Sequence, residues 1–276
     1  MKALKSRAIS SGTGIEQARQ KLPNVERTWY GIVSPLIVIA IIAIAWEFAS
    51  LNVSPILIPS PQRVGSDFIK LLGLKSTRVA FLISIRELYI GLTIGVVAGI
   101  LLGMLIGRYR VAEGILGPFI NSANATPLNI LIPLLIVWVG ISTNARILFI
   151  ILITFFPVLL NTAGGLRNVG RGYVEVGMTM GLNEKQLLRK VILPAAIPYI
   201  IAGLRIGVAL AVIGMILGEM EISNVGLGYL LSFYGQGFQT GMLIGLVFIA
   251  ALIGVINVMI VRGIQRVWFK WTIVGK

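Results

Sequence analysis

The chain has 276 residues, of which 57% are hydrophobic and 12% are charged, and its mean hydropathy is +0.92. Soluble domains are about half apolar and a quarter charged, so this composition excludes an ordinary soluble protein and leaves room for about six membrane spans of roughly 20 residues each. Neither Cys nor His occurs. Their absence excludes disulfides, thiolate and imidazole chemistry and the usual zinc or haem ligands, so we predict no catalytic residues and no metal site.

Charge-free apolar runs predict the elements in chain order. The first 27 residues are polar and basic without an apolar core, which does not indicate a cleavable signal peptide. We expect a basic cytoplasmic segment, residues 1–27, followed by a transmembrane domain, residues 28–276. The expected fold class is all-α and polytopic. The predicted spans are residues 28–46, 88–107, a span within the longer run 114–145, 147–166, 199–218 and 241–261.

Lys and Arg are distributed unevenly between the two sides that six spans define. With the N-terminus inside, 17 of the 24 lie on the inner side and six on the outer side, while Arg205 lies within the fifth span. The positive-inside rule therefore predicts cytoplasmic N- and C-termini and a cytoplasmic segment between spans four and five. Residues 220–240 carry no Lys or Arg and are expected to form an external loop. The orientation of the chain in the membrane therefore explains the net charge of +14, and no nucleic-acid partner is expected.

The outer segment after span one has the pattern of a short helix. Ser60 and Pro61 fit an N-cap and a first helical position, and Val64, Phe68 and Leu71 follow at helical spacing. Two interpretations stay open, an amphipathic helix in the outer membrane interface and a solvated loop helix.

Five glycines recur at every fourth position of span two. Small residues at this spacing let two helix backbones approach closely in lipid, so we predict a packing face rather than a functional site. The glycines are Gly91, Gly95, Gly99, Gly103 and Gly107.

The third span contains polar residues around two prolines, in the stretch NSANATPLNILIP (121–133). Polar side chains are costly against lipid, and prolines free backbone carbonyls, which suits a helix lining a water-filled path. Hydrogen bonding between packed helices is an equally good interpretation. The candidate path residues here are Asn121, Asn124, Thr126 and Asn129.

Two ionisable residues of the fifth span are further path candidates. Arg205 lies about two turns into the span, and Glu219 lies near its outer end. Ionisable groups within a membrane are candidates for function. For Arg205, snorkelling of the guanidinium to the cytoplasmic interface is the competing interpretation.

The charged stretch EVGMTMGLNEKQLLRKVILP (175–194) follows span four and predicts two short helices. Gly181 separates them, and Asn183 with Gln186 fits a capping box at the start of the second. That second helix is expected to end at Leu193–Pro194, because the residue before a proline avoids helical geometry. Such a pair could dock into a groove of another protein, or it could be an ordinary solvated loop. Its apolar side chains are Val176, Met180, Leu182, Leu187 and Leu188, and its basic ones are Lys185, Arg189 and Lys190.

The same stretch resembles the E-A-A-x-x-x-G-x(9)-I-x-L-P motif of inner-membrane permeases of binding-protein-dependent ABC importers. Glu175, Gly181, Leu193 and Pro194 stand at the motif positions, while Val176, Gly177 and Val191 replace its two alanines and its isoleucine. Further stretches resemble the sulfonate, taurine and nitrate branch of that family, from about residue 30 to the end. They are ILIPSPQRV (56–64), IPLLIVWVGI (132–141), GLRIG (203–207) and Glu219 with GLGYL (226–230).

This resemblance implies a type I ABC importer permease whose coupling segment, about residues 167–198, sits in a cleft of a cytoplasmic ATPase. Glu175 and Gly181 would shape its turn, and the basic second helix would face the ATPase. The implied partners are two ATPase subunits, a second permease copy or paralogue, and an external solute-binding protein, in a prokaryotic inner membrane. No cofactor is expected on this chain, with ATP and Mg on the ATPase, and small anions are the commonest cargo of the branch. The implied coupling residues are Glu175, Gly181, Leu182, Asn183, Lys185, Leu193 and Pro194.

Two other classes of protein fit the sequence less well than the permease. A self-sufficient carrier or channel often shows internal repeats and midplane carboxylates, and neither is found here. An enzyme would need a catalytic set, and an ATPase a phosphate loop G-x-x-x-x-G-K-[ST]. The nearest approach, GLKST (73–77), has Leu74 in place of the second glycine.

Overall fold

The computed structural model describes residues 24–269, and within this range the secondary structure is entirely helical. The predicted segment 1–27 therefore lies almost wholly outside the described residues. The chain divides into two compact units, residues 1–63 and 64–276. Five helices are long and apolar enough to cross a membrane, and a sixth span results if a bent pair of helices counts as one. This agrees with the predicted all-α polytopic class.

The first unit contains α2 (Asn24–Asn52), which is longer than the predicted span 28–46 at both ends. The chain after α2 folds back locally, because the indole Nε1 of Trp46 donates a hydrogen bond of 3.0 Å to the carbonyl of Pro59. The helix α3 (Pro61–Gly73) then begins at the predicted proline.

Within the second unit, α3 packs its apolar face on protein. Val64 and Leu71 are buried, and Leu71 and Phe68 join a core cluster with residues of α11 (Leu227–Gln236) and α12 (Thr240–Trp268). The Asp67 carboxylate lies against Gly241 in the first turn of α12, where a negative charge is favourable. The sequence offered an amphipathic helix in the membrane interface or a solvated loop helix. Neither describes α3 fully, because its apolar face packs on α11 and α12.

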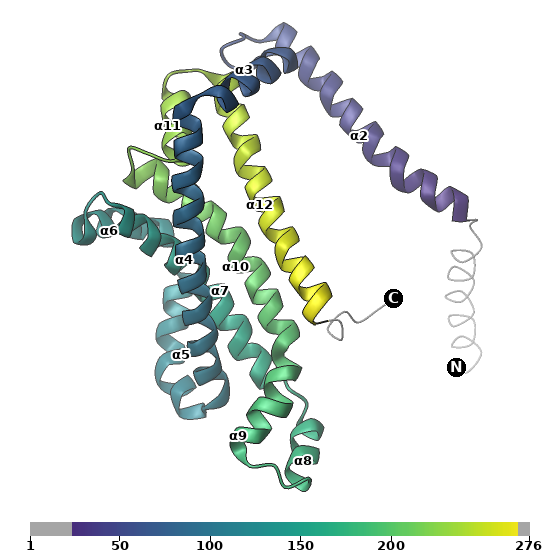
Figure 1. Cartoon of the computed structure of the whole chain (residues 1–276), viewed down its shortest axis with the longest axis vertical. Coiled ribbons are helices and arrows are strands. Elements are labelled where there is room, and N and C mark those ends of the chain that lie inside the picture. Colours follow the sequence, from purple (N-terminus) through teal and green to yellow (C-terminus); the bar gives the residue numbers. More distant parts are fainter. Residues whose placement is uncertain (1–23, 270–276) are drawn as a thin grey trace, which may run out of the picture. The chain divides into compact units, whose positions relative to one another are not determined.

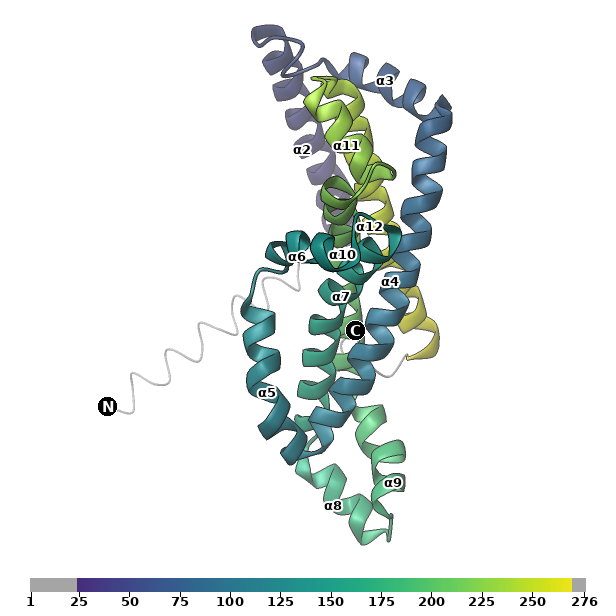
Figure 2. The same cartoon turned by 90° about the vertical axis from the view of Figure 1, so that its left-hand side faces the viewer.

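The centre of the second unit is formed by α4 (Lys75–Arg108), α7 (Thr143–Arg167) and α10 (Leu193–Ile222), which run side by side (Figures 1 and 2). The glycine face of α4 meets α7, as predicted. A Cβ added at Gly99 would lie 2.9 Å from the Phe155 carbonyl oxygen, and one at Gly103 would lie 2.7 Å from that of Leu159. The close approach of the two backbones therefore depends on the missing side chains.

The predicted third span is a broken pair of helices. The first part, α5 (Arg110–Ala125), is followed by a short 3-10 turn (Leu128–Leu131) and α6 (Ile132–Val139), and the two parts are bent by 91° at the break (Figure 2). Pro127 lies in the break, where it cannot supply a backbone donor and its ring disfavours a continuous helix. The predicted span within 114–145 is therefore divided in two at its stretch of polar residues and prolines.

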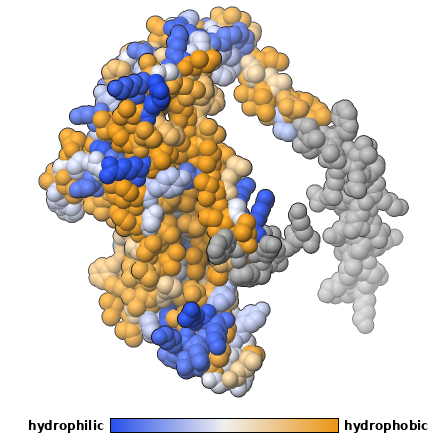
Figure 3. All heavy atoms as spheres, viewed as in Figure 1, coloured by the Kyte–Doolittle hydropathy of each residue, from blue (hydrophilic) through white to orange (hydrophobic). Residues whose placement is uncertain are grey.

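Residues 220–240 do not form a simple external loop. They contain α11, and Leu227, Leu230, Leu231 and Tyr234 of this helix are buried in the core cluster with Leu246 of α12. Outside this core, apolar side chains cover much of the visible face of the second unit, and hydrophilic ones gather toward both of its ends, one of which is formed by α8 (Arg171–Thr179) and α9 (Glu184–Leu187) (Figure 3).

Candidate functional site

The helix pair α8–α9 is closed by the turn that the sequence predicts. Gly181 has φ of +75°, a left-handed conformation that glycine adopts without steric cost. Its N–H donates to the Met178 carbonyl at 2.9 Å, and the N–H of Leu182 donates to the Gly177 carbonyl at 3.2 Å. This pair of bonds is a Schellman motif, which satisfies the last carbonyls of α8 and reverses the chain.

The second helix begins with the predicted capping box. The Asn183 side chain accepts the N–H of Gln186 at 2.9 Å, and the Gln186 side chain accepts the N–H of Asn183 at 3.0 Å. These bonds satisfy two of the free donors at the helix start.

The predicted end of this helix at Leu193–Pro194 was wrong. After α9 the chain passes through a π-helical turn, Leu188–Ile192, and continues directly into α10. Pro194 occupies the first turn of α10. Proline has no backbone N–H to donate, and the extra residue of the π turn lets the helix continue without that hydrogen bond. The second helix of the pair and the fifth span therefore form one continuous helical rod of 39 residues, Glu184–Ile222.

Gly177 explains one departure from the family motif. It is buried, and a Cβ there would lie 2.6 Å from Cδ1 of Leu187. The absence of a side chain at Gly177 therefore leaves room for Leu187 between α8 and the rod. Leu187 is buried, while Val176 and Met180 are exposed, so the predicted apolar surface divides into an internal and an external part.

The outward surface of α8–α9 combines exposed apolar and basic groups. Met178 is 60% exposed and Met180 is 76% exposed, and the neighbouring Lys185, Arg189 and Lys190 are exposed as well. Glu184 forms an ion pair of 3.3 Å with Arg108 at the end of α4. The side chain of Glu175 is exposed and has no hydrogen bond or ion pair within residues 24–269, so its contribution to the turn stays a prediction.

Three of the predicted path residues line one cavity. Asn124, Thr126 and Asn129 surround a space of about 370 Å³ at the break between α5 and α6. Its other walls are Phe149, Ile153, Phe156 and Pro157 of α7 and Leu210 and Leu217 of α10. The cavity is thus polar on the side of the broken span and apolar on the other, and no charged side chain lines it.

The other three predicted path residues lie elsewhere. Asn121 lines a separate cavity of about 310 Å³ near the ion pair between Glu113 and Arg167. Arg205 donates a hydrogen bond of 2.8 Å to the Gln265 side chain on α12. Glu219 is completely buried, and its carboxylate accepts the N–H of Gly228 at 2.8 Å and fills the space beside Gly226. Glu219 thus holds the connection between α10 and α11 in place.

A buried ion pair was missed by the sequence prediction. The guanidinium of Arg146 on α7 donates to both carboxylate oxygens of Glu87 on α4, at 2.8 and 2.5 Å. Both residues fall directly before predicted spans, 88–107 and 147–166, because a span was defined by the absence of charge. The helices extend through them, and the charges neutralise each other inside the helix pair. The available signal was a carboxylate and a guanidinium that directly precede predicted spans two and four.

The broken helix, the polar cavity and the exposed helix pair are typical of one class of protein, the polytopic transport subunit. Residues 95–273 match the family "Binding-protein-dependent transport system inner membrane component". The chain belongs to this family and is a permease subunit of an ABC importer.

Known relatives agree with the family. "Putative aliphatic sulfonates transport permease protein SsuC" of Escherichia coli is 34% identical over 89% of this chain and 94% of its own. The riboflavin transport system permease protein RibX of Chloroflexus aurantiacus is 35% identical over 78% of this chain and 80% of its own. Among solved structures, an amino acid ABC transporter matches with a TM-score of 0.54 at 16% identity, covering 75% of this chain and 94% of that one. This match shows the shared fold.

Proposed function

We propose that this permease carries a small organic or inorganic anion, such as a sulfonate, taurine, nitrate or bicarbonate, and that α8–α9 couples it to a separate cytoplasmic ATPase. The single observation that carries the coupling role is the exposed surface of α8–α9. Met178 and Met180 offer adaptable apolar contacts, and three basic residues surround them. The continuous rod Glu184–Ile222 would transmit a movement of this surface into the membrane.

The complete importer then contains two ATPase subunits with ATP and Mg, a second permease copy or paralogue, and an external solute-binding protein. Both termini lie in the cytoplasm, since the basic α8–α9 surface and most of the Lys and Arg residues fall on that side. The inner membrane of a prokaryote is the expected location. The self-sufficient carrier or channel is the alternative.

The coupling role is tested by crosslinking from a single cysteine, which is unique because the chain has none. Met178→Cys is expected to crosslink to a copurifying ATPase in the purified native complex, with mass spectrometry identifying the partner. Ile69→Cys on α3, 72% exposed at the opposite end, is the matched control and should not crosslink to it. If the chain purifies alone or only with copies of itself, the carrier or channel alternative replaces the importer.

The anion proposal rests on the side chains around the 370 Å³ cavity. The amides of Asn124 and Asn129 can donate hydrogen bonds that replace the hydration of an anion. The name of the sulfonate relative favours this cargo, while the riboflavin relative shows that other solutes are handled by similar permeases.

Asn129→Leu is expected to lower uptake of a labelled alkanesulfonate about tenfold or more, since one hydrogen bond to a charged group contributes roughly 1.5–3 kcal/mol. Uptake is measured in cells that also contain the cognate ATPase and binding protein. Asn52→Leu, at the exposed end of α2, removes an amide far from the cavity residues in sequence and should leave uptake unchanged. Equal uptake by wild type and Asn129→Leu would show that the cavity is packing space.

A further inference from the structure

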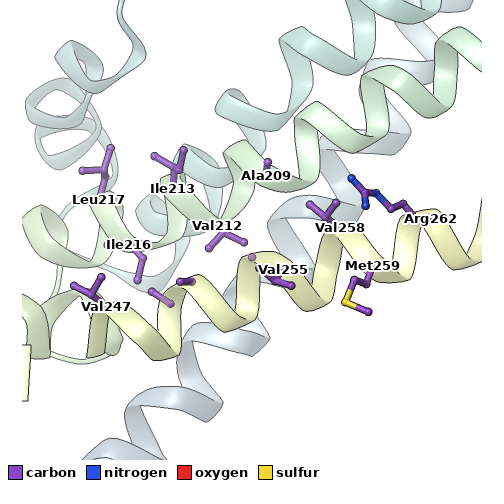
Figure 4. Close-up of a pocket in the computed structure, with 13 residues that line it drawn as sticks. Ala209, Val212, Ile213, Ile216, Leu217, Val247, Val255, Val258, Met259 and Arg262 are labelled. Carbon is purple, nitrogen blue, oxygen red and sulfur yellow. The ribbon is translucent and has the colours of Figure 1, made fainter. Parts of the chain in front are cut away.

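A long apolar groove runs between α10 and α12 in the second unit. Its volume is about 690 Å³, and it is lined by Val212 and Ile216 of α10 and by Val247 and Val255 of α12 (Figure 4). Small residues of α12, Ala250, Ala251 and Gly254, hollow out its wall. Of the residues that line the groove, only Arg262 is charged.

The dimensions of the groove fit a hydrocarbon chain. From Val247 to Arg262 it follows α12 for about 22 Å, at about 1.5 Å per residue. Half of a bilayer's hydrocarbon core is about 15 Å thick, so a chain with its headgroup at Arg262 passes through one leaflet inside the groove. A helix about 10 Å across and equally long displaces about 1,700 Å³, so only a ridge of its side chains could enter.

One end of the groove is positively charged without compensation. Arg262 is exposed and has no hydrogen bond or ion pair within the described part of the chain. One turn beyond the groove on α10, Arg205 reaches across to Gln265 of α12, and its buried Nε has no partner there. α12 contains no Asp or Glu, and those of α10 are Glu219 and Glu221 at its other end. Two guanidinium groups from facing helices therefore lack an anion.

We propose that the α10–α12 groove binds one acyl chain of an anionic phospholipid whose phosphate pairs with Arg262. Arginine donors match phosphate oxygens in geometry and charge. The cytoplasmic leaflet, to which the proposed orientation assigns this end, is the one rich in anionic lipids. This lipid site lies on the membrane-facing surface of the permease and is separate from the Asn124–Asn129 cavity and from the coupling segment.

The experiment is native mass spectrometry of the intact importer taken from nanodiscs of phosphatidylcholine with phosphatidylglycerol. We expect wild-type complex to retain phosphatidylglycerol, and Arg262→Gln to retain about fivefold less, because one basic residue near the surface contributes about 1 kcal/mol. Arg110→Gln removes the same charge from the exposed start of α5 and should retain as much lipid as wild type.

A second variant tests the acyl chain independently of the headgroup. A Cβ at Gly254 has no heavy atom within 4 Å, so Gly254→Phe is expected to fold and to fill the groove. It should lower retention of phosphatidylglycerol and phosphatidylcholine alike. Equal losses from Arg262→Gln and Arg110→Gln would overturn the headgroup contact. Efficient disulfide formation between Gly254→Cys and Ile42→Cys on α2, in the same or a second copy, would show that a helix covers the groove and would overturn the lipid site.

Discussion

Replacing Arg146 with methionine is expected to destabilise the protein by about 3–5 kcal/mol, the usual cost of removing one partner from a buried ion pair. Arg146 is 5% exposed and Glu87 is 1% exposed, so water cannot solvate the carboxylate that remains. Arg146 also donates to the Thr143 hydroxyl at 3.1 Å, and its charge acts on the buried Glu219 nearby. The loss should appear as a lower melting temperature of the purified complex, followed by tryptophan fluorescence.

The matched control is an exposed ion pair with a comparable distance. Lys70→Met removes the partner of Asp67, at 3.2 Å and with Lys70 65% exposed, and surface pairs contribute only about 0–1 kcal/mol. The double variant Glu87→Leu with Arg146→Met should recover much of the lost stability, because it leaves no unpaired charge. A small effect of Arg146→Met, similar to that of Lys70→Met, would mean that the pair is hydrated in the membrane.

Gly181→Val should abolish ATP-driven uptake while the protein still inserts into the membrane. A β-branched residue at φ of +75° is strained by about 1–3 kcal/mol, and the cheapest relief is a change of the turn. That change breaks the Schellman bonds from Gly181 and Leu182 and moves α8 against the rod. Uptake in cells and recovery of the ATPase with the tagged permease measure the effect.

Gly181→Asn is the control variant, since asparagine tolerates the left-handed conformation better than other non-glycine residues. We expect it to retain most of the uptake. No heavy atom lies within 4 Å of a Cβ built at Gly181, so a difference between Val and Asn reports backbone strain rather than a clash. Normal uptake by Gly181→Val would mean that the geometry of this turn is not needed for energy coupling.

The class of protein and its local devices could be predicted from the sequence alone. The hydropathy follows directly from the composition. An apolar run long enough to cross the bilayer forms a helix, because its backbone groups must hydrogen-bond within the segment. The capping box at Asn183, the turn at Gly181 and the glycine face of α4 depend on residues within four positions of each other. Such patterns are predictable because helix geometry relates neighbours in a fixed way.

Only the tertiary structure decided what depends on distant partners. Glu87 and Arg146 are 59 residues apart, so their pairing cannot be inferred from a charge count. The burial of α11 depends on α12 and α3, and Asn124, Thr126 and Asn129 line one cavity because the chain bends between α5 and α6. The continuation of the helix through Pro194 required a π turn. In each case the free energy comes from contacts between segments that local propensity does not describe.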